Sequence, residues 1–336
     1  MPPPYTGAAL AEKNYGLLKE WGIHTKAVSI TLDNASSNDS MVDCLKFDLD
    51  LMGDGAYFHV RCCAHILNLI VQDGLKELDE AVKKVRECAK YCKGSQNRKN
   101  SFSRAVQHVG IESTRELRQD VSTRWNSTFL MLESALFHKK ALLHLAKNDA
   151  NFVHCPNSLE WSKIEKISKF LQVYHQVTLA FSGSNYPTSN LYFPNVLKVR
   201  LLLKEELESK DEFIKSMATK MNLKFDKYWC KFSTIMAIAV IFYPRYKFHI
   251  IEWAYKKIYG SSSDLELDLF KHKLFSLFEE YALIKRYMNE KSKGVESSSS
   301  KVDKTVDSYM TVKNCFFFKI VIYFSFCLTL LLLLGF

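Results

Sequence analysis

Apolar and polar residues alternate along "AVSITL" at 27–32, so that Val28, Ile30 and Leu32 share one face. A period of two predicts a β-strand over 27–33. Apolar residues at helical spacing predict a helix at about 38–50, and "AYFHVRC" at 56–62 predicts a second strand. A strand, a helix and a strand in so few residues imply a right-handed crossover, with the two strands paired in parallel.

After the second strand the apolar spacing becomes helical. One long amphipathic helix is predicted from about Ala64 to Lys90, and from Ser101 to about Met288 the pattern is almost entirely helical. The basic run "KGSQNRKNSFSR" at 93–104 lies between two helices. We interpret it as a solvated flexible loop, or else as a loop that contacts phosphate. The sequence thus predicts an α/β piece followed by a large helical block.

The end of the sequence differs from the rest. Residues 291–314 are rich in Ser and Lys and are typical of a solvated linker. Residues 315–336, "CFFFKIVIYFSFCLTLLLLLGF", form an apolar tail that by length just suffices to span a bilayer as a helix. The tail is either a genuine membrane anchor or translated noncoding sequence.

Composition narrows the class of protein. The 336 residues are 47% hydrophobic, which suits a globular chain with a sizeable core and excludes disorder. A net charge of +10 suits a polyanionic partner such as nucleic acid. Nine cysteines without disulfide-framework spacing favour a reducing compartment. The sequence contains no Gly-rich phosphate loop, G-x-S-x-G or H-E-x-x-H, which argues against an NTPase, a serine hydrolase and a zincin.

Asp33 is the first candidate for chemistry. It falls at the carboxyl end of the first predicted strand, where open α/β sheets place their ligands. A carboxylate at a strand end is a candidate metal ligand, and the alternative is that Asp33 only caps a turn. The residues that follow, Ser36, Ser37, Asn38 and Asp39, are all good helix caps and predict a helix start.

Two further motifs carry polar chemistry. Cys62 and His65 form C-x-x-H at a strand-to-helix junction, but a zinc site would want a second ligand pair at suitable spacing. No zinc is therefore predicted, and the simpler interpretation is a buried thiol beside a hydrogen-bonded His. In "VSTRWNSTFLML", Trp125 offers a face for base stacking and Arg124 a contact to phosphate. The alternative is a core Trp beside a surface Arg.

The order of these motifs is distinctive. "HTKAVSITLDNASSND", then "GAYFHVRCCAHILNLIVQDGL", then "VSTRWNSTFLML" resembles the hAT-superfamily transposases, and most closely the domesticated plant-type, RICESLEEPER-like branch with its BED-type zinc finger. The later "FDKYWCKFSTIMAIAVIFYPRYKF" is similar to that branch's RNase-H-fold segment. The resemblance covers about residues 3–290.

The resemblance implies a fold and a set of site residues. The expected fold is α/β plus α: a partial RNase-H-like catalytic core, a βαβ piece, interrupted by a large all-helical insertion. The family's active site holds Mg²⁺ or Mn²⁺ on three acids, of which Asp33 matches the second. Cys62 and His65 match the family's C-x-x-H pair, and Trp125 matches the Trp that stacks on a flipped base. The residues expected to bind DNA are Arg61, Cys62, His65, Arg98, Lys99, Arg104, Arg124 and Trp125.

The same resemblance gives domain boundaries. We expect a partial RNase-H-like core at 1–95, a helical insertion at 96–222 and a mostly helical hAT-like RNase-H-fold segment at 223–290. The linker at 291–314 and the apolar tail at 315–336 follow. In the family the first acid lies on an earlier strand, the third acid lies near a C-terminal dimerisation segment, and a BED-type zinc finger precedes the core. None of these three is recognisable here.

The expected function follows from these departures. We expect a truncated, transposase-derived nuclear protein that binds DNA, holds no catalytic metal tightly and lacks transposase activity. Its expected assembly is a homodimer or a complex with a full-length relative. One alternative is an active metal-dependent strand-transfer enzyme that a partner chain completes. Another is a helical interaction protein anchored in a membrane by 315–336.

Overall fold

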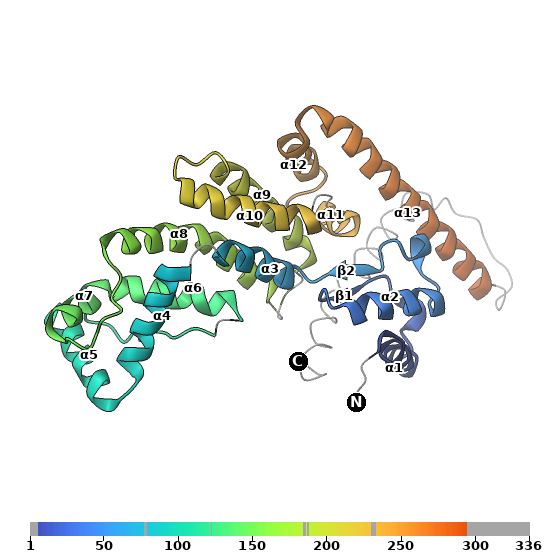
Figure 1. Ribbon diagram of the computed structural model, residues 1–336. Helices are drawn as coiled ribbons and strands as arrows, with labels where there is room; N and C mark the ends of the chain where they lie inside the picture. The colour runs from blue at the N-terminus through green and yellow to red at the C-terminus, as the bar shows by residue number, and fades with distance from the viewer. Residues whose placement is uncertain are drawn as a thin grey trace. The chain divides into compact units, whose positions relative to one another are not determined.

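The computed structural model describes residues 6–76, 79–121, 123–183, 186, 188–229 and 233–293, which are mostly helical (Figure 1). The chain forms two compact units. The sheet unit takes its residues from Met1–His65, Ala180–Leu197 and Lys231–Phe336, and the helical unit from Ile66–Leu179 and Lys198–Cys230. The first three residues expected in the linker, 291–293, belong to the last helix, and the rest of the linker and the apolar tail lie outside the described residues. No helix in the described ranges is both long and apolar enough to cross a membrane.

The first segment of the sheet unit contains the predicted strand, helix and strand. Its elements are α1 (Gly7–Glu20), β1 (Ile30–Leu32), α2 (Ser36–Asp48) and β2 (His59–Arg61). The two strands pair in parallel, with Ile30 opposite His59 and Leu32 opposite Arg61, which confirms the predicted pairing. Each strand has three residues, so both are shorter than the sequence pattern suggested.

The core of this segment lies between α1 and α2. Met41, Val42 and Leu45 on α2 are buried together with Ala11 of α1 and with Phe58, which precedes β2. The predicted apolar stripe of α2 is therefore confirmed. Figure 1 shows α1 beside α2, and the two helices pack closely.

The predicted capping of α2 is wrong in detail. Ala35 occupies the N-cap position and makes no side-chain cap bond, so the four polar residues 36–39 lie inside the first turn of the helix. The turn that leads into the helix is held by Asp33 instead, because its Oδ1 accepts a hydrogen bond from the Ala35 N–H at 3.0 Å.

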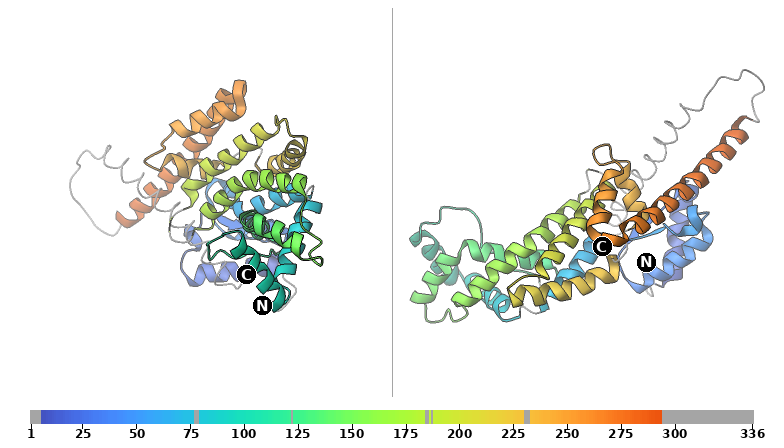
Figure 2. Two further views of the ribbon diagram at one scale, coloured as in Figure 1. Left: turned by 90° about the vertical axis from the view of Figure 1, so that its left-hand side faces the viewer. Right: turned by 90° about the horizontal axis from the view of Figure 1, so that it is seen from above.

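The later part of the sheet unit is helical and includes α11 (Thr234–Ile241), α12 (His249–Tyr259) and α13 (Ser263–Lys293). Residues 243–246 make a turn between α11 and α12. Figure 2 shows α13 as one uninterrupted helix in both views. Both carboxylate oxygens of Glu280 on α13 lie within 3.0 Å of the Gly53 N–H. This contact joins two segments of the sheet unit that are distant in sequence.

The remaining helices are α3 (Cys63–Leu75), α4 (Asp79–Lys93), α5 (Gln96–His108), α6 (Trp125–Phe137), α7 (Lys139–Asn148), α8 (Ser158–Phe181), α9 (Ser189–Glu206) and α10 (Glu212–Trp229). Two predictions are wrong here. The single helix expected from Ala64 to Lys90 is two helices, α3 and α4. The basic run expected to be a loop is mostly helix α5, whose first turn is capped by the Ser95 hydroxyl accepting from the Arg98 N–H.

Candidate functional site

Asp33 lies directly after β1 and its side chain is exposed. Its Oδ1 accepts two hydrogen bonds, from the Ala35 N–H at 3.0 Å and from Nδ2 of Asn38 at 2.6 Å. An Asp that bonds the backbone two residues on forms an Asx turn. Asp33 therefore caps a turn, and because both donors use Oδ1, Oδ2 is the oxygen left for a cation.

Arg61 at the end of β2 lies among polar side chains of the neighbouring β1–α2 turn. Its guanidinium donates to Oδ1 of Asn34 at 2.9 Å and to Oδ1 of Asp39 at 3.2 Å. His59 lies 3.7 Å from the same Asp39 oxygen, and its pKa is lowered by burial and by the charge of Arg61. Asp39 is thus an ion-pair partner of Arg61 and not an unengaged carboxylate beside Asp33.

The donor set at this strand edge does not fit a catalytic metal centre. In the part of the chain that the structure describes, no three His, Cys, Asp or Glu side chains gather closely enough to hold a metal ion. Hard divalent cations such as Mg²⁺ take several oxygen ligands, and a pair of them takes more. Asp33 offers one oxygen beside an Arg–Asp pair. Asp33 by itself does not supply the ligand set of a catalytic metal centre.

Cys62 and His65 lie at the junction of β2 and α3. The Cys62 N–H donates to the Leu32 carbonyl at 2.7 Å, which continues the parallel ladder. Burial raises the pKa of the Cys62 thiol, against the opposing effect of the backbone N–H groups of His65 and Ala64. At neutral pH the thiol is protonated and poorly nucleophilic. Cys62 is thus a partly buried, protonated thiol.

Trp125 begins α6 and is buried, with 2% of its surface exposed. Its ring centroid lies 6.5 Å from that of Phe129 and 6.4 Å from that of His175. Arg124, the residue before it, is the N-cap of α6 and is exposed. A base can stack on the Trp125 face only if neighbouring side chains first move aside. Arg124 needs no such change to contact phosphate.

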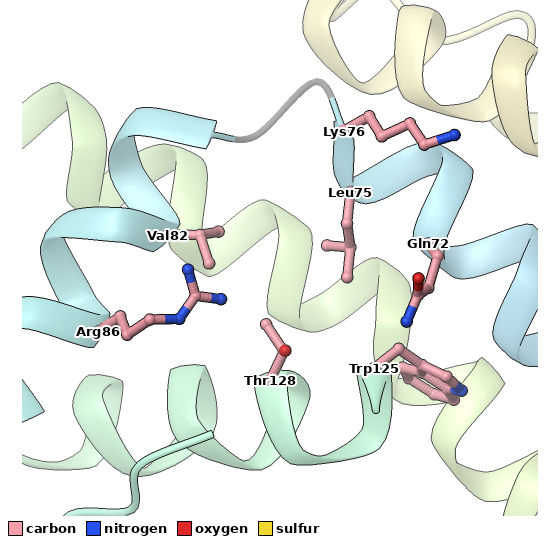
Figure 3. A pocket seen from close by; sticks show the side chains of 7 residues that line it. All are labelled: Gln72, Leu75, Lys76, Val82, Arg86, Trp125 and Thr128. Atoms are coloured by element: carbon pink, nitrogen blue, oxygen red, sulfur yellow. The ribbon is translucent and has the colours of Figure 1, made fainter. Parts of the chain in front are cut away.

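A pocket of about 170 Å³ lies beside Trp125 in the helical unit (Figure 3). Its lining comes from α3, from the residue that follows α3, and from α4 and α6. The residues are Gln72, Leu75, Lys76, Val82, Arg86, Trp125 and Thr128. Figure 3 shows the amide of Gln72 and the indole of Trp125 at one side and the guanidinium of Arg86 at the other. The amide of Gln72 donates to the Thr123 carbonyl at 2.8 Å, which holds the segment leading into α6.

Arg86 is fixed by an ion pair that the sequence did not reveal. Its Nε and Nη2 donate to the two carboxylate oxygens of Asp120 at 2.8 and 2.7 Å, and the Thr128 hydroxyl donates to Oδ2 at 2.9 Å. The Asp120 side chain is 1% exposed. Burial alone would raise the Asp120 pKa, but these hydrogen bonds outweigh it and leave the pKa below its ordinary value.

The predicted phosphate-binding residues of the basic run lie on α5. Arg98, Lys99 and Arg104 are all exposed. The Arg98 guanidinium lies 4.1 Å from the centroid of the Tyr91 ring, a cation–π contact that orients it. At about 100° per residue, Arg98, Lys99 and Arg104 point to different sides of the helix. The structure therefore presents basic side chains around α5, and not along one stripe of it.

Family models match three stretches of the chain in order. They are described as the ZBED1 RNase-like domain at residues 1–56, the ZBED1 RNase-like helical domain at 60–170, and the hAT-like transposase, RNase-H fold, at 190–281. The second stretch contains Cys62, His65 and Trp125, and the first contains Asp33.

Curated proteins of plants are similar over most of the chain. Zinc finger BED domain-containing protein RICESLEEPER 2 of Oryza sativa subsp. japonica is 34% identical over 83% of this chain and 39% of its own length. Putative AC transposase of Zea mays is 33% identical over 83% of this chain and 35% of its own length. Zinc finger BED domain-containing protein DAYSLEEPER of Arabidopsis thaliana is 25% identical over 87% of this chain and 42% of its own length. The chain thus spans well under half the length of these relatives.

Proposed function

Because this chain is a homologue of the hAT transposases and of the RICESLEEPER zinc finger BED proteins, we propose that it is a transposase-derived DNA-binding protein that performs no strand transfer by itself. The proposal has two parts, DNA binding and the absence of catalysis. Different observations support each part, and different experiments test them.

Charge supports the DNA-binding part. The chain carries a net charge of +10. Arg98, Lys99 and Arg104 are exposed on different sides of α5, and Arg124 is exposed at the N-cap position of α6. Exposed guanidinium and ammonium groups bind backbone phosphates without reading sequence, and each such contact releases condensed counterions. Arg61, Cys62, His65 and Trp125 remain proposed DNA contacts in the sheet and helical units.

The surroundings of Asp33 support the absence of catalysis, and this observation carries the proposal. Asp33 is held in a turn by Ala35 and Asn38, and the nearby Asp39 is paired with Arg61. A strand-transfer site of the two-metal kind needs several carboxylates around its ions. We propose that Asp33, the counterpart of the family's second acid, binds Mg²⁺ or Mn²⁺ weakly in this chain.

Binding is tested by fluorescence anisotropy with a labelled 30-base-pair duplex over a series of salt concentrations. Each lost phosphate contact should reduce the slope of log K against log salt by about 0.9. Arg98→Gln/Arg104→Gln is expected to reduce the slope by about 1.8 if both residues contact phosphate. Lys13→Gln/Lys26→Gln removes the same charge from exposed positions in the sheet unit and serves as the control. Equal slopes for the two double variants would contradict a role of α5.

Catalysis is tested by incubating the chain and the duplex with Mg²⁺ or Mn²⁺ and resolving the strands on a denaturing gel. We expect no cleavage. Metal-dependent cleavage that disappears in Asp33→Asn would overturn this part of the proposal. It would favour the alternative of an active transposase, whose remaining acids come from elsewhere.

Location and assembly follow from the same proposal. A DNA-binding protein of this type is expected in the nucleus, which a fluorescent fusion of the full chain tests directly. We further propose that it assembles with itself or with a longer relative. Sedimentation of the purified chain, alone and mixed with such a relative, measures both.

A further inference from the structure

A second and larger pocket lies in the helical unit, between the end of α4, helix α5, the α6–α7 junction and the segment 113–117. Its volume is about 520 Å³, within the range of roughly 300–1,000 Å³ typical of small-molecule sites. The lining residues are Cys92, Lys93, Lys99, Phe102, Ser103, Val106, Ser113, Thr114, Arg115, Glu116, Leu117 and His138. This pocket is distinct from the one beside Trp125, with which it shares no lining residue.

One part of the lining is cationic and rich in hydroxyl groups. Lys93 and Lys99 have no carboxylate partner within the described ranges, whereas Nη2 of Arg115 lies 2.8 Å from Glu133. Three hydroxyls lie in the same lining, those of Ser103, Ser113 and Thr114, against a single carboxylate from Glu116. Two unpaired ammonium groups and several hydroxyls are the donors that bind a phosphate.

Another part of the lining is apolar and aromatic. Phe102, Val106 and Leu117 line the pocket together with His138, whose ring centroid lies 5.5 Å from that of Phe102. His138 is 2% exposed, and its Nδ1 lies 2.9 Å from the Ser134 carbonyl oxygen. A carbonyl only accepts, so we assign the proton to Nδ1, which makes Nε2 an acceptor. The pocket thus offers a flat apolar wall and an acceptor for a ligand hydroxyl or amine.

We propose that this pocket binds an organic phosphate of nucleotide size. The phosphate lies against Lys93 and Lys99, the planar ring packs on Phe102, and a ligand N–H or O–H donates to His138. Inorganic phosphate would leave the apolar wall unused, and an apolar molecule would leave two ammonium groups unused. A free mononucleotide and the terminal nucleotide of a 5′-phosphorylated strand share this chemistry.

Isothermal titration of the full chain with dAMP tests the proposal, with inorganic phosphate and deoxyadenosine as separate titrants. We expect saturable binding of dAMP that is about tenfold tighter than binding of either part. Lys99→Gln is expected to weaken it by about tenfold, which corresponds to about 1.4 kcal/mol. The matched control is Lys147→Gln, which removes one charge from an exposed position on α7 that is outside the lining.

Three results would overturn the proposal. They are no binding of dAMP at millimolar concentration, equal affinity for dAMP and inorganic phosphate, and equal losses in the two variants. The last result would mean that the helical unit attracts anions by charge alone. The source of the ligand is distinguished by a short single strand with and without a 5′-phosphate. If Lys99→Gln weakens the binding of the phosphorylated strand only, the pocket binds strand ends. If it weakens the binding of dAMP but of neither strand, the pocket binds free nucleotides. Because dAMP carries no duplex backbone, failure here leaves the duplex-binding proposal intact.

Discussion

Replacing Arg86 with Ala is expected to destabilise the helical unit, because it leaves the Asp120 carboxylate buried with only part of its hydrogen bonds. Two charge-assisted bonds at 2.8 and 2.7 Å are lost, and the bond from Thr128 at 2.9 Å remains. Breaking a buried ion pair costs about 3–5 kcal/mol. The Arg86 side chain is 25% exposed, so solvent already screens one end of the pair. We therefore expect a loss of about 3 kcal/mol in the free energy of unfolding.

Asp120→Asn removes the negative charge and keeps nearly the same side-chain size and shape. The amide still accepts one bond from Arg86, which can also reach water, so the expected cost is about 1–2 kcal/mol. In the double variant, the loss of Arg86 no longer leaves a buried charge without a partner. The cost of the double variant should therefore be about 2 kcal/mol smaller than the sum of the two single costs. Urea titrations followed by far-UV circular dichroism measure all four proteins, and their m-values should agree. Additive costs, or a cost of Arg86→Ala below about 1 kcal/mol, would refute this reasoning.

The pair also predicts a pH dependence. The pKa of Asp120 lies below the value of about 3.9 for an unfolded Asp. The pair therefore stabilises the fold fully above about pH 3.9, and this contribution is lost as the pH falls through the folded-state pKa. The difference in unfolding free energy between the wild type and Asp120→Asn should be constant from pH 7 to pH 5 and shrink below about pH 4. A difference that is the same at pH 3.5 as at pH 7 would contradict the assignment.

Three further predictions concern single contacts. Glu280→Gln should speed amide exchange at Gly53, because a carboxylate accepts from that N–H within 3.0 Å; an unchanged rate by exchange mass spectrometry would exclude the contact. Gly7→Ala should cost about 1–3 kcal/mol, since the new Cβ would lie 2.4 Å from Cβ of Ser40 on the facing helix; an unchanged urea midpoint would contradict the packing of α1 on α2. Burial raises the pKa of Cys92 to about 12, so a disulfide reagent at pH 8 should label this thiol only after unfolding, as peptide mass spectrometry would detect.

The crossover in the sheet unit was predictable because its signals are local. Alternation at Val28, Ile30 and Leu32 marks the first strand, and the stripe that includes Met41 and Leu45 marks the helix that follows. Handedness and pairing rules then leave parallel strands as the natural arrangement. The structure confirms that pairing. Only the lengths of the strands differ, since a side-chain pattern does not report where backbone hydrogen bonding ends.

The helical unit shows where the pattern misleads. The apolar stripe runs through residues 64–90 without a break, so spacing gives no sign that α3 ends at Leu75 and α4 begins at Asp79. In α5 the density of charge suggested a loop, although Ser95 is a good N-cap and Phe102, Ala105 and Val106 lie at helical spacing. That capping signal was present in the sequence and would have predicted the helix.

Among the candidate sites, too, the contacts between residues close in sequence were predictable and the contacts between distant residues were not. Asp33 and its turn partners lie within five residues of one another, so the turn-capping interpretation was available from sequence. The Arg86–Asp120 pair joins residues that are 34 positions apart. Lys93, Lys99 and Arg115 likewise reach one pocket from separate segments. The spacing of neighbouring residues cannot predict these contacts, because the fold brings together side chains that are distant in the sequence.

The segments of the sheet unit are synthesised at widely separated times. The ribosome completes the first segment of the sheet unit at His65 and reaches the third at Lys231, 231 − 65 = 166 residues later. At roughly 5–20 residues per second, that interval lasts roughly 10–30 s. All of the helical unit is made within it, while the β1–α2–β2 crossover still lacks Glu280, which holds Gly53. The first segment of the sheet unit therefore waits longest for its partners during synthesis, and the helical unit is complete before they arrive.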